Sequence, residues 1–140
     1  MLKQYPLPVA LSICLTAGVF AALVSTAAFW AGGHFGILHS LGVNLSPIWE
    51  WSWIKPRLLW GAFWGIGYLP VGRLSSHPFP AALLYGLVPA AFQLLYYFPQ
   101  RTGGGWFGLN HGTWTPLVIV AVSLVFGFAL WGWAALCGRR

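Results

Sequence analysis

The chain has 140 residues, of which 59% are hydrophobic and 6% are charged, and its mean hydropathy is +0.74. A soluble domain carries about 25% charged residues, so this chain has too little charge for a water-facing surface. Seven lysines and arginines oppose one acid, but these cations flank apolar runs singly or in pairs. Their spacing favours anionic lipid headgroups as partners and argues against nucleic acid. The apolar runs are continuous, which predicts a helical integral membrane protein.

The first apolar run predicts a transmembrane helix at about residues 9–30, long enough to cross a bilayer. Small residues recur along it every three or four positions, including Gly18 and Ala21, so one face should admit another helix closely. A signal peptide is the competing interpretation, because a lysine precedes the run and small residues end it. The run is long for a signal peptide, and we therefore expect a retained helix.

The segment 31–54 predicts a surface region between the first and second helices. Apolar residues between positions 35 and 45 recur near the helical period, which predicts a short interfacial helix. The next feature is an alternation of Trp49, Trp51 and Trp53, which would place three indoles on one side of an extended chain. Indole favours the headgroup level, so we interpret these residues as an interfacial aromatic belt. A stacking platform for a ring-bearing ligand is the alternative.

The second helix is predicted at about 56–71, with its proline in the first turn. The 15 residues between Arg57 and Arg73 are uncharged and would extend roughly 22 Å, against a hydrocarbon core of roughly 30 Å. Snorkelling cations and local thinning of the bilayer make a span feasible, whereas a core or re-entrant helix is the alternative. Gly61 and Gly65 lie four residues apart and predict close helix packing.

The third helix is predicted at about 80–99 and the fourth at about 114–137. Pro89 predicts a kink near the middle of the third helix. Gln93 is the most polar side chain deep in any span, so we expect it to face inward and to hydrogen-bond another helix. A ligand contact is the alternative role for this amide. Small residues for close packing occur on both helices, namely Gly86, Ala90 and Gly127.

Candidate metal-binding or catalytic side chains are few and lie outside the predicted spans. Three histidines and the single acid fall in loops on the side of the membrane away from the termini: His34, His39, Glu50 and His111. These side chains suit zinc, copper or iron, but their spacing matches no metal motif. The spans contain no histidine or acid for a transmembrane haem or a proton relay. The sequence therefore gives no support for an enzyme.

Together these patterns predict a single domain over residues 1–140, an all-α bundle of four transmembrane helices with an interfacial segment between the first two. Four spans place both termini on one side, and the slight excess of cations there favours the cytoplasm. The leading hypothesis is a non-catalytic accessory or scaffolding subunit of a respiratory or photosynthetic complex, in a bacterial inner or photosynthetic membrane. It would pack against other membrane subunits and bind lipid, quinone or pigment. The alternatives are a metal-binding protein or enzyme using loop histidines, and a small oligomeric transporter lined by Gln93.

Overall fold

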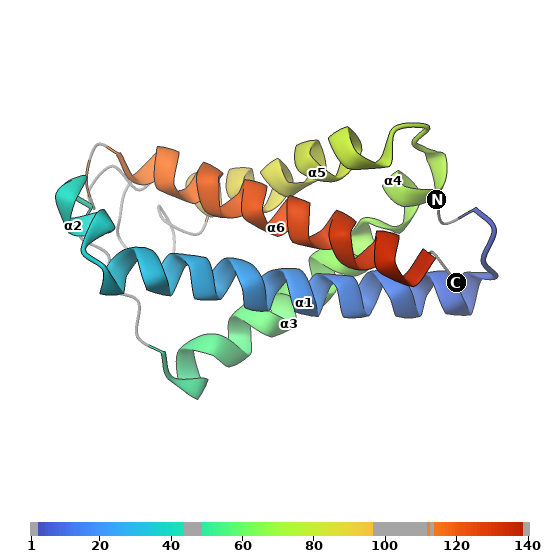
Figure 1. Ribbon diagram of the computed structural model, residues 1–140, viewed down its shortest axis with the longest axis horizontal. Helices are drawn as coiled ribbons and strands as arrows, with labels where there is room; N and C mark the ends of the chain where they lie inside the picture. The colour runs from blue at the N-terminus through green and yellow to red at the C-terminus, as the bar shows by residue number, and fades with distance from the viewer. Residues whose placement is uncertain (1–2, 44–48, 97–111, 113, 139–140) are drawn as a thin grey trace.

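The computed structural model describes residues 3–43, 49–96, 112 and 114–138, and every regular element within these ranges is a helix (Figure 1). The all-α prediction is therefore confirmed. In chain order the helices are α1 (Leu7–His34), α2 (Ile37–Ser40), α3 (Trp51–Gly67), α4 (Leu69–Leu74), α5 (Pro78–Phe92) and α6 (Thr115–Gly138).

Three helical segments are long and apolar enough to cross a membrane: Leu7–His34, Pro78–Tyr96 and Thr115–Cys137. By their length and composition, these helices indicate an integral membrane protein in contact with the lipid bilayer. The first helix extends beyond its predicted range of 9–30 at both ends and has 28 residues. The third predicted helix corresponds to α5 and continues past it to Tyr96 as a wider, π-helical turn. The rest of its predicted range lies outside the described residues.

The second predicted helix differs most from the structure. It begins at Trp51 instead of residue 56, and a change of direction at Tyr68 divides it into α3 and α4. The carbonyl of Glu50 accepts hydrogen bonds from the backbone N–H groups of Trp53 (3.0 Å) and Ile54 (2.9 Å). The proline expected in the first turn therefore lies inside α3. Early helix formation satisfies backbone groups that would be costly to expose near hydrocarbon.

The extended conformation predicted for the three tryptophans is accordingly wrong for Trp51 and Trp53, which form the first turn of α3. Trp49 precedes the helix, and its ring lies 5.7 Å from the ring of Trp30 at the end of α1. Trp53 is half-buried, whereas Trp51 is 66% exposed. The three indoles therefore do not share one face, and they have different surroundings.

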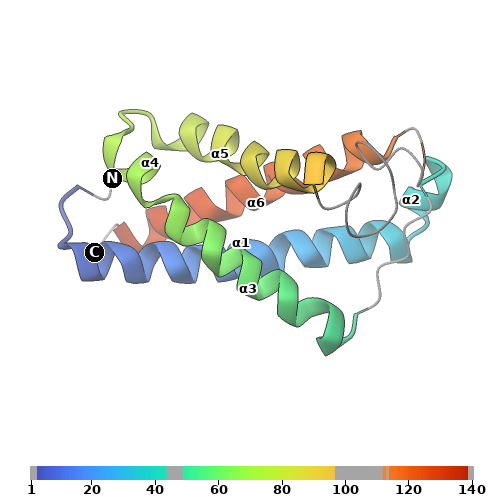
Figure 2. The same cartoon turned by 180° about the vertical axis from the view of Figure 1, so that it is seen from behind.

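The helices form a bundle in which α1 contacts both α3 and α6, and α6 contacts α5. Figures 1 and 2 show α1, α6 and α5 side by side, with α3 crossing α1 at an angle. Both termini lie at one end of the bundle and α2 lies at the other, where the positive φ of Gly36 (77°) permits the turn out of α1. From α3, the chain returns through α4 to the end that holds the termini (Figure 2).

Small residues allow two very close helix contacts. A Cβ atom built on Gly65 would lie 2.7 Å from the Cα of Gly18, so the backbones of α3 and α1 touch directly. A Cβ built on Gly86 would lie 3.1 Å from the Cα of Gly127, which brings α5 against α6 in the same way. Close backbone approach gains dispersion energy in a membrane, where burial of apolar surface offers little driving force between helices.

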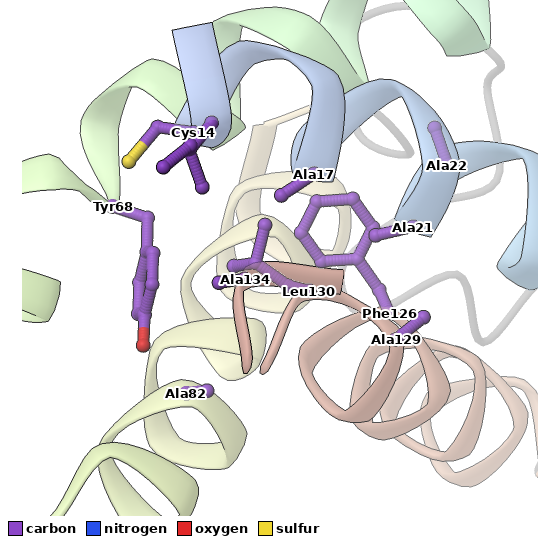
Figure 3. Close-up of a cluster of buried hydrophobic side chains, with 11 residues drawn as sticks. Cys14, Ala17, Ala21, Ala22, Tyr68, Ala82, Phe126, Ala129, Leu130 and Ala134 are labelled. Atoms are coloured by element: carbon purple, nitrogen blue, oxygen red, sulfur yellow. The ribbon is translucent and has the colours of Figure 1, made fainter. Parts of the chain in front are cut away.

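The main core lies where α1, α5 and α6 meet near the junction of α3 with α4, and Figure 3 shows its side chains. Ala21 of α1 is fully buried in this core. Ala90 of α5 belongs to a separate cluster with Leu94 and Ile119. Tyr68 is also fully buried, and its ring reaches toward Ala82 of α5. This tyrosine fills the space at the junction between α3 and α4.

Candidate functional site: an aromatic cavity beside Arg57

A partly open cavity of about 450 Å³ lies among α1, α3, α5 and α6. This volume falls within the range of roughly 300–1,000 Å³ that is typical of small-molecule sites. Its lining is mainly apolar and aromatic, with a few polar side chains: Ser25, Thr26, Ser52, Arg57, Gln93 and Ser123. The cavity is therefore the strongest candidate for a binding site in the described part of the chain.

The position of Arg57 follows from the packing of α3 on α1. The two helices run in opposite directions, and steps of four residues on each bring successive pairs together. Gly65 meets Gly18, and Gly61 meets the side chain of Ala22. One further step places Arg57 beside Thr26, whose Oγ1 accepts a hydrogen bond from the arginine Nε at 2.9 Å. The register set by Gly61 and Gly65 therefore places the guanidinium of Arg57 in the cavity wall.

Aromatic rings hold the Arg57 guanidinium from its other sides. Its Cζ lies 4.9 Å from the ring centroid of Trp53 and 5.6 Å from that of Phe29. Both distances fall within the range of a cation–π interaction, worth about 0.5–2 kcal/mol depending on solvation. A cation that is costly in hydrocarbon is thereby stabilised at a fixed position.

A second group of rings forms the opposite part of the wall. The ring of Phe92 on α5 lies 5.4 Å from Trp60 and 5.8 Å from Trp64 of α3. Through these contacts α3 and α5 meet beside the cavity, although their backbones stay apart. The rings provide a large, rigid apolar surface one to two helical turns from Arg57.

Gln93 lines the cavity, as expected for an inward-facing residue, and its side chain is half-buried. We expected its amide to hydrogen-bond another helix, but it makes no such bond among the residues that the structure describes. Ser25 uses its hydroxyl locally, donating to the carbonyl of Ala22 at 3.2 Å. No carboxylate occurs among the described lining residues, so the polar groups of the wall are hydrogen-bond donors, hydroxyls and one amide carbonyl.

The proposed metal ligands are dispersed. His34 stacks on Trp30 with ring centroids 4.9 Å apart, whereas His39 lies on α2 and Glu50 at the start of α3. All three side chains are exposed, and within residues 3–43, 49–96, 112 and 114–138 no three His, Cys, Asp or Glu residues gather as metal ligands do. His111 lies outside the described residues. This geometry provides no candidate metal centre.

The sequence interpretation did not assign Arg57 to a site, because it treated the residue as a cation snorkelling at the end of a span. The available signal was its spacing, since Arg57, Gly61 and Gly65 are separated by four residues and share a helix face. Among the residues that the structure describes, the cavity wall thus combines one fixed cation with aromatic rings and has no acid–base pair. No protein-family model matches the chain, and no curated protein or solved structure is significantly similar to it.

Proposed function

We propose that this protein is a non-catalytic accessory subunit of a larger complex in a bacterial inner or photosynthetic membrane, and that it holds an amphiphilic ligand in the cavity. The observation that carries the proposal is the pairing of Arg57 with an aromatic wall inside a helical membrane bundle. Such a wall suits a ligand with a polar head and an apolar body. The described lining residues offer no carboxylate or histidine for proton transfer, which favours binding over catalysis.

The proposal includes four spans. The 17 residues of α3 rise about 26 Å, and the 6 residues of α4 continue toward the end of the bundle that holds the termini (Figure 2), which supports a path across a core of roughly 30 Å. The location of both termini at one end of the bundle supports the same topology (Figure 1). We place this end in the cytoplasm.

Cysteine labelling tests this topology. Single cysteines at Lys3, Ser40 and Arg140 are introduced into a chain in which Cys14 and Cys137 are alanine, and intact cells and inverted vesicles receive a membrane-impermeant maleimide. We expect Lys3→Cys and Arg140→Cys to react only in inverted vesicles and Ser40→Cys only in cells. Detergent should make all three react, which controls for local burial. Labelling of Lys3→Cys and Arg140→Cys from opposite sides would contradict four spans.

The accessory role is suggested by apolar side chains that point away from the bundle. Phe63 on α3, Leu84 on α5 and Phe128 on α6 are each more than half exposed. Lipid covers such side chains in a lone protein, whereas partner helices cover some of them in a complex. The three exposed positions lie on different helices, so more than one face is available for neighbours.

Isolation from native membranes tests the accessory role. The tagged protein is extracted in mild detergent, and the eluate is examined by mass spectrometry and visible absorption. We expect stoichiometric partner subunits together with a bound lipid, quinone or pigment. Arg57→Gln should retain the partners and lose the ligand, because the partner faces lie away from the cavity. Recovery of the protein alone would contradict the subunit role and favour the transporter alternative, in which Gln93 lines a path.

A further inference from the structure

Two polar side chains in the cavity wall have no hydrogen-bond partner among the described residues, and they indicate the chemistry of the ligand. We infer that the cavity binds a quinone, whose two carbonyl oxygens accept hydrogen bonds from Gln93 and Ser123. The ring of the quinone lies against the aromatic wall formed by Trp60, Trp64 and Phe92. This inference rests on the proposed use of the cavity as a ligand site and names the class of ligand.

The first argument is the state of the polar groups in the wall. Ser123 on α6 is only 5% exposed, yet its hydroxyl makes no hydrogen bond within the described part of the chain, and its oxygen remains accessible. The amide of Gln93 on α5 is half-buried and also lacks a hydrogen bond to any described residue. By contrast, the hydroxyl of Ser25 is already used, because it donates to the carbonyl of Ala22. A ligand that supplies acceptors to an apolar wall satisfies the two unused donors.

The second argument is charge. A hydroxyl and a primary amide are neutral donors, and each of them pairs with an uncharged carbonyl oxygen. The described lining residues include no carboxylate that could pair with an ammonium group. The one cation among them, Arg57, already interacts with Thr26 and Trp53. The unused polar groups of the wall therefore match an uncharged ligand.

The third argument is the separation of the two donors. A Cβ built on Gly86 of α5 would meet the carbonyl oxygen of Ser123, which places these two residues side by side. Gln93 follows Gly86 by seven residues, or about 10 Å along the helix. This separation favours a ligand with acceptors on opposite sides of a rigid body over a ligand with one acceptor. A 1,4-quinone has its two carbonyl groups on opposite sides of one ring.

The fourth argument is the shape of the apolar wall. The planes of Trp60 and Trp64 on α3 are 27° apart, and the ring of Phe92 on α5 lies 5.4 Å from that of Trp60. Such a wall contacts the face of a flat conjugated ring more fully than a flexible acyl chain, and ring pairs are stabilised beyond their buried area. Gln93 directly follows Phe92 and begins the π-helical turn, a feature frequent at functional sites. The apolar surface and one donor are therefore adjacent.

Equilibrium binding of a short-chain quinone tests the inference. The full-length protein in nanodiscs is titrated with a radiolabelled, fully substituted 1,4-benzoquinone that carries a short isoprenoid tail, and empty nanodiscs give the background. Full substitution prevents addition of the quinone to the two cysteines. The comparison ligand carries the same substituents on a benzene ring without carbonyl groups. We expect the quinone to bind with a roughly 25-fold lower Kd, because two neutral hydrogen bonds contribute about fivefold each.

Matched variants identify the donors. Ser123→Ala and Gln93→Leu should each weaken quinone binding roughly fivefold and leave binding of the carbonyl-free ligand unchanged. Ser25→Ala is the control and should retain wild-type affinity, because the Ser25 hydroxyl is in the same wall but is already bonded within its own helix. Circular dichroism verifies that each variant is folded. The comparison of the two ligands in the wild-type protein still decides the question if a variant does not fold.

Infrared spectroscopy of the bound quinone provides a second measurement. Hydrogen bonding lowers the stretching frequency of a carbonyl group, so both carbonyl bands of a ¹³C-labelled quinone should shift down on binding. Ser123→Ala and Gln93→Leu should each restore one of the two bands. Bands that do not shift in the wild-type protein would overturn the inference.

The outcomes separate this inference from the proposed function. A preference for the quinone that both Ser123→Ala and Gln93→Leu reduce supports the inference. Equal binding of the two ligands overturns it and leaves the cavity as a site for apolar molecules. A preference that survives both substitutions also overturns it, since other groups then hold the carbonyls. Absence of saturable binding overturns the inference as well, whereas isolation of the protein without partner subunits overturns the accessory role.

Discussion

Replacing Gly65 with leucine is expected to detach α3 from α1 and to lower the free energy of unfolding by about 3 kcal/mol or more. A Cβ atom at this position would overlap the carbonyl oxygen of Cys14 and lie 2.7 Å from the Cα and 2.9 Å from the N of Gly18. These are backbone atoms, so no side-chain rotation relieves the overlap and the helices must separate. Denaturation in mixed micelles, followed by circular dichroism, measures the change.

Gly132→Leu on α6 is the matched control for this substitution. A Cβ at Gly132 meets no atom within 4 Å, so the same leucine should change the free energy of unfolding by less than about 1 kcal/mol. Gly65→Ala should fall between Gly65→Leu and the wild-type protein. If Gly65→Leu and Gly132→Leu unfold alike, α3 and α1 do not approach one another as closely as described.

The second large effect is expected for Tyr68→Ala, which should cost about 3–5 kcal/mol of stability. The side chain is fully buried between α3 and α4, and its ring centroid lies 5.5 Å from that of Tyr85. Deleting it leaves a void that the packed helices cannot fill, and buried aromatic residues replaced by alanine lose energy in this range. The same mixed-micelle denaturation measures the loss.

Tyr68→Phe separates the contribution of the ring from that of the hydroxyl. The Tyr68 hydroxyl is buried and has no hydrogen-bond partner among the described residues. Removing it should therefore leave stability unchanged or raise it by up to about 1 kcal/mol. Destabilisation of Tyr68→Phe equal to that of Tyr68→Ala would show that the hydroxyl, rather than packing of the ring, stabilises this junction.

Local spacing made much of the bundle predictable. Uninterrupted apolar runs identified the three long helices, and residues separated by four positions placed Gly61 and Gly65 on one face before any partner was known. Helix ends were less predictable, because the start of α3 depends on how the tryptophan-rich segment satisfies its backbone groups near the membrane surface. The break at Tyr68 did have a local signal, because Gly65 and Gly67 precede it and Pro70 lies in the first turn of α4, where it cannot donate a backbone hydrogen bond.

Local sequence patterns could not predict the cavity. It exists because α3 crosses α1 at an angle while α5 packs on α6, and these two contacts involve residues far apart in the sequence. Whether Arg57 points to the membrane surface or into the bundle depends on that crossing. Gln93 shows the same dependence, since its place in the cavity wall follows from the separation of α3 and α5.

The contact between Gly18 and Gly65 has a consequence for the electrostatics of the membrane. Arg57 lies two helical turns from Gly65 on the same helix. The contact between the two glycines therefore determines how far the positive charge of Arg57 enters the bilayer. Sliding α3 along α1 by one turn would move the charge by about 5.4 Å along the bundle. Two residues without side chains thus set the depth of the cation, although neither of them contacts it.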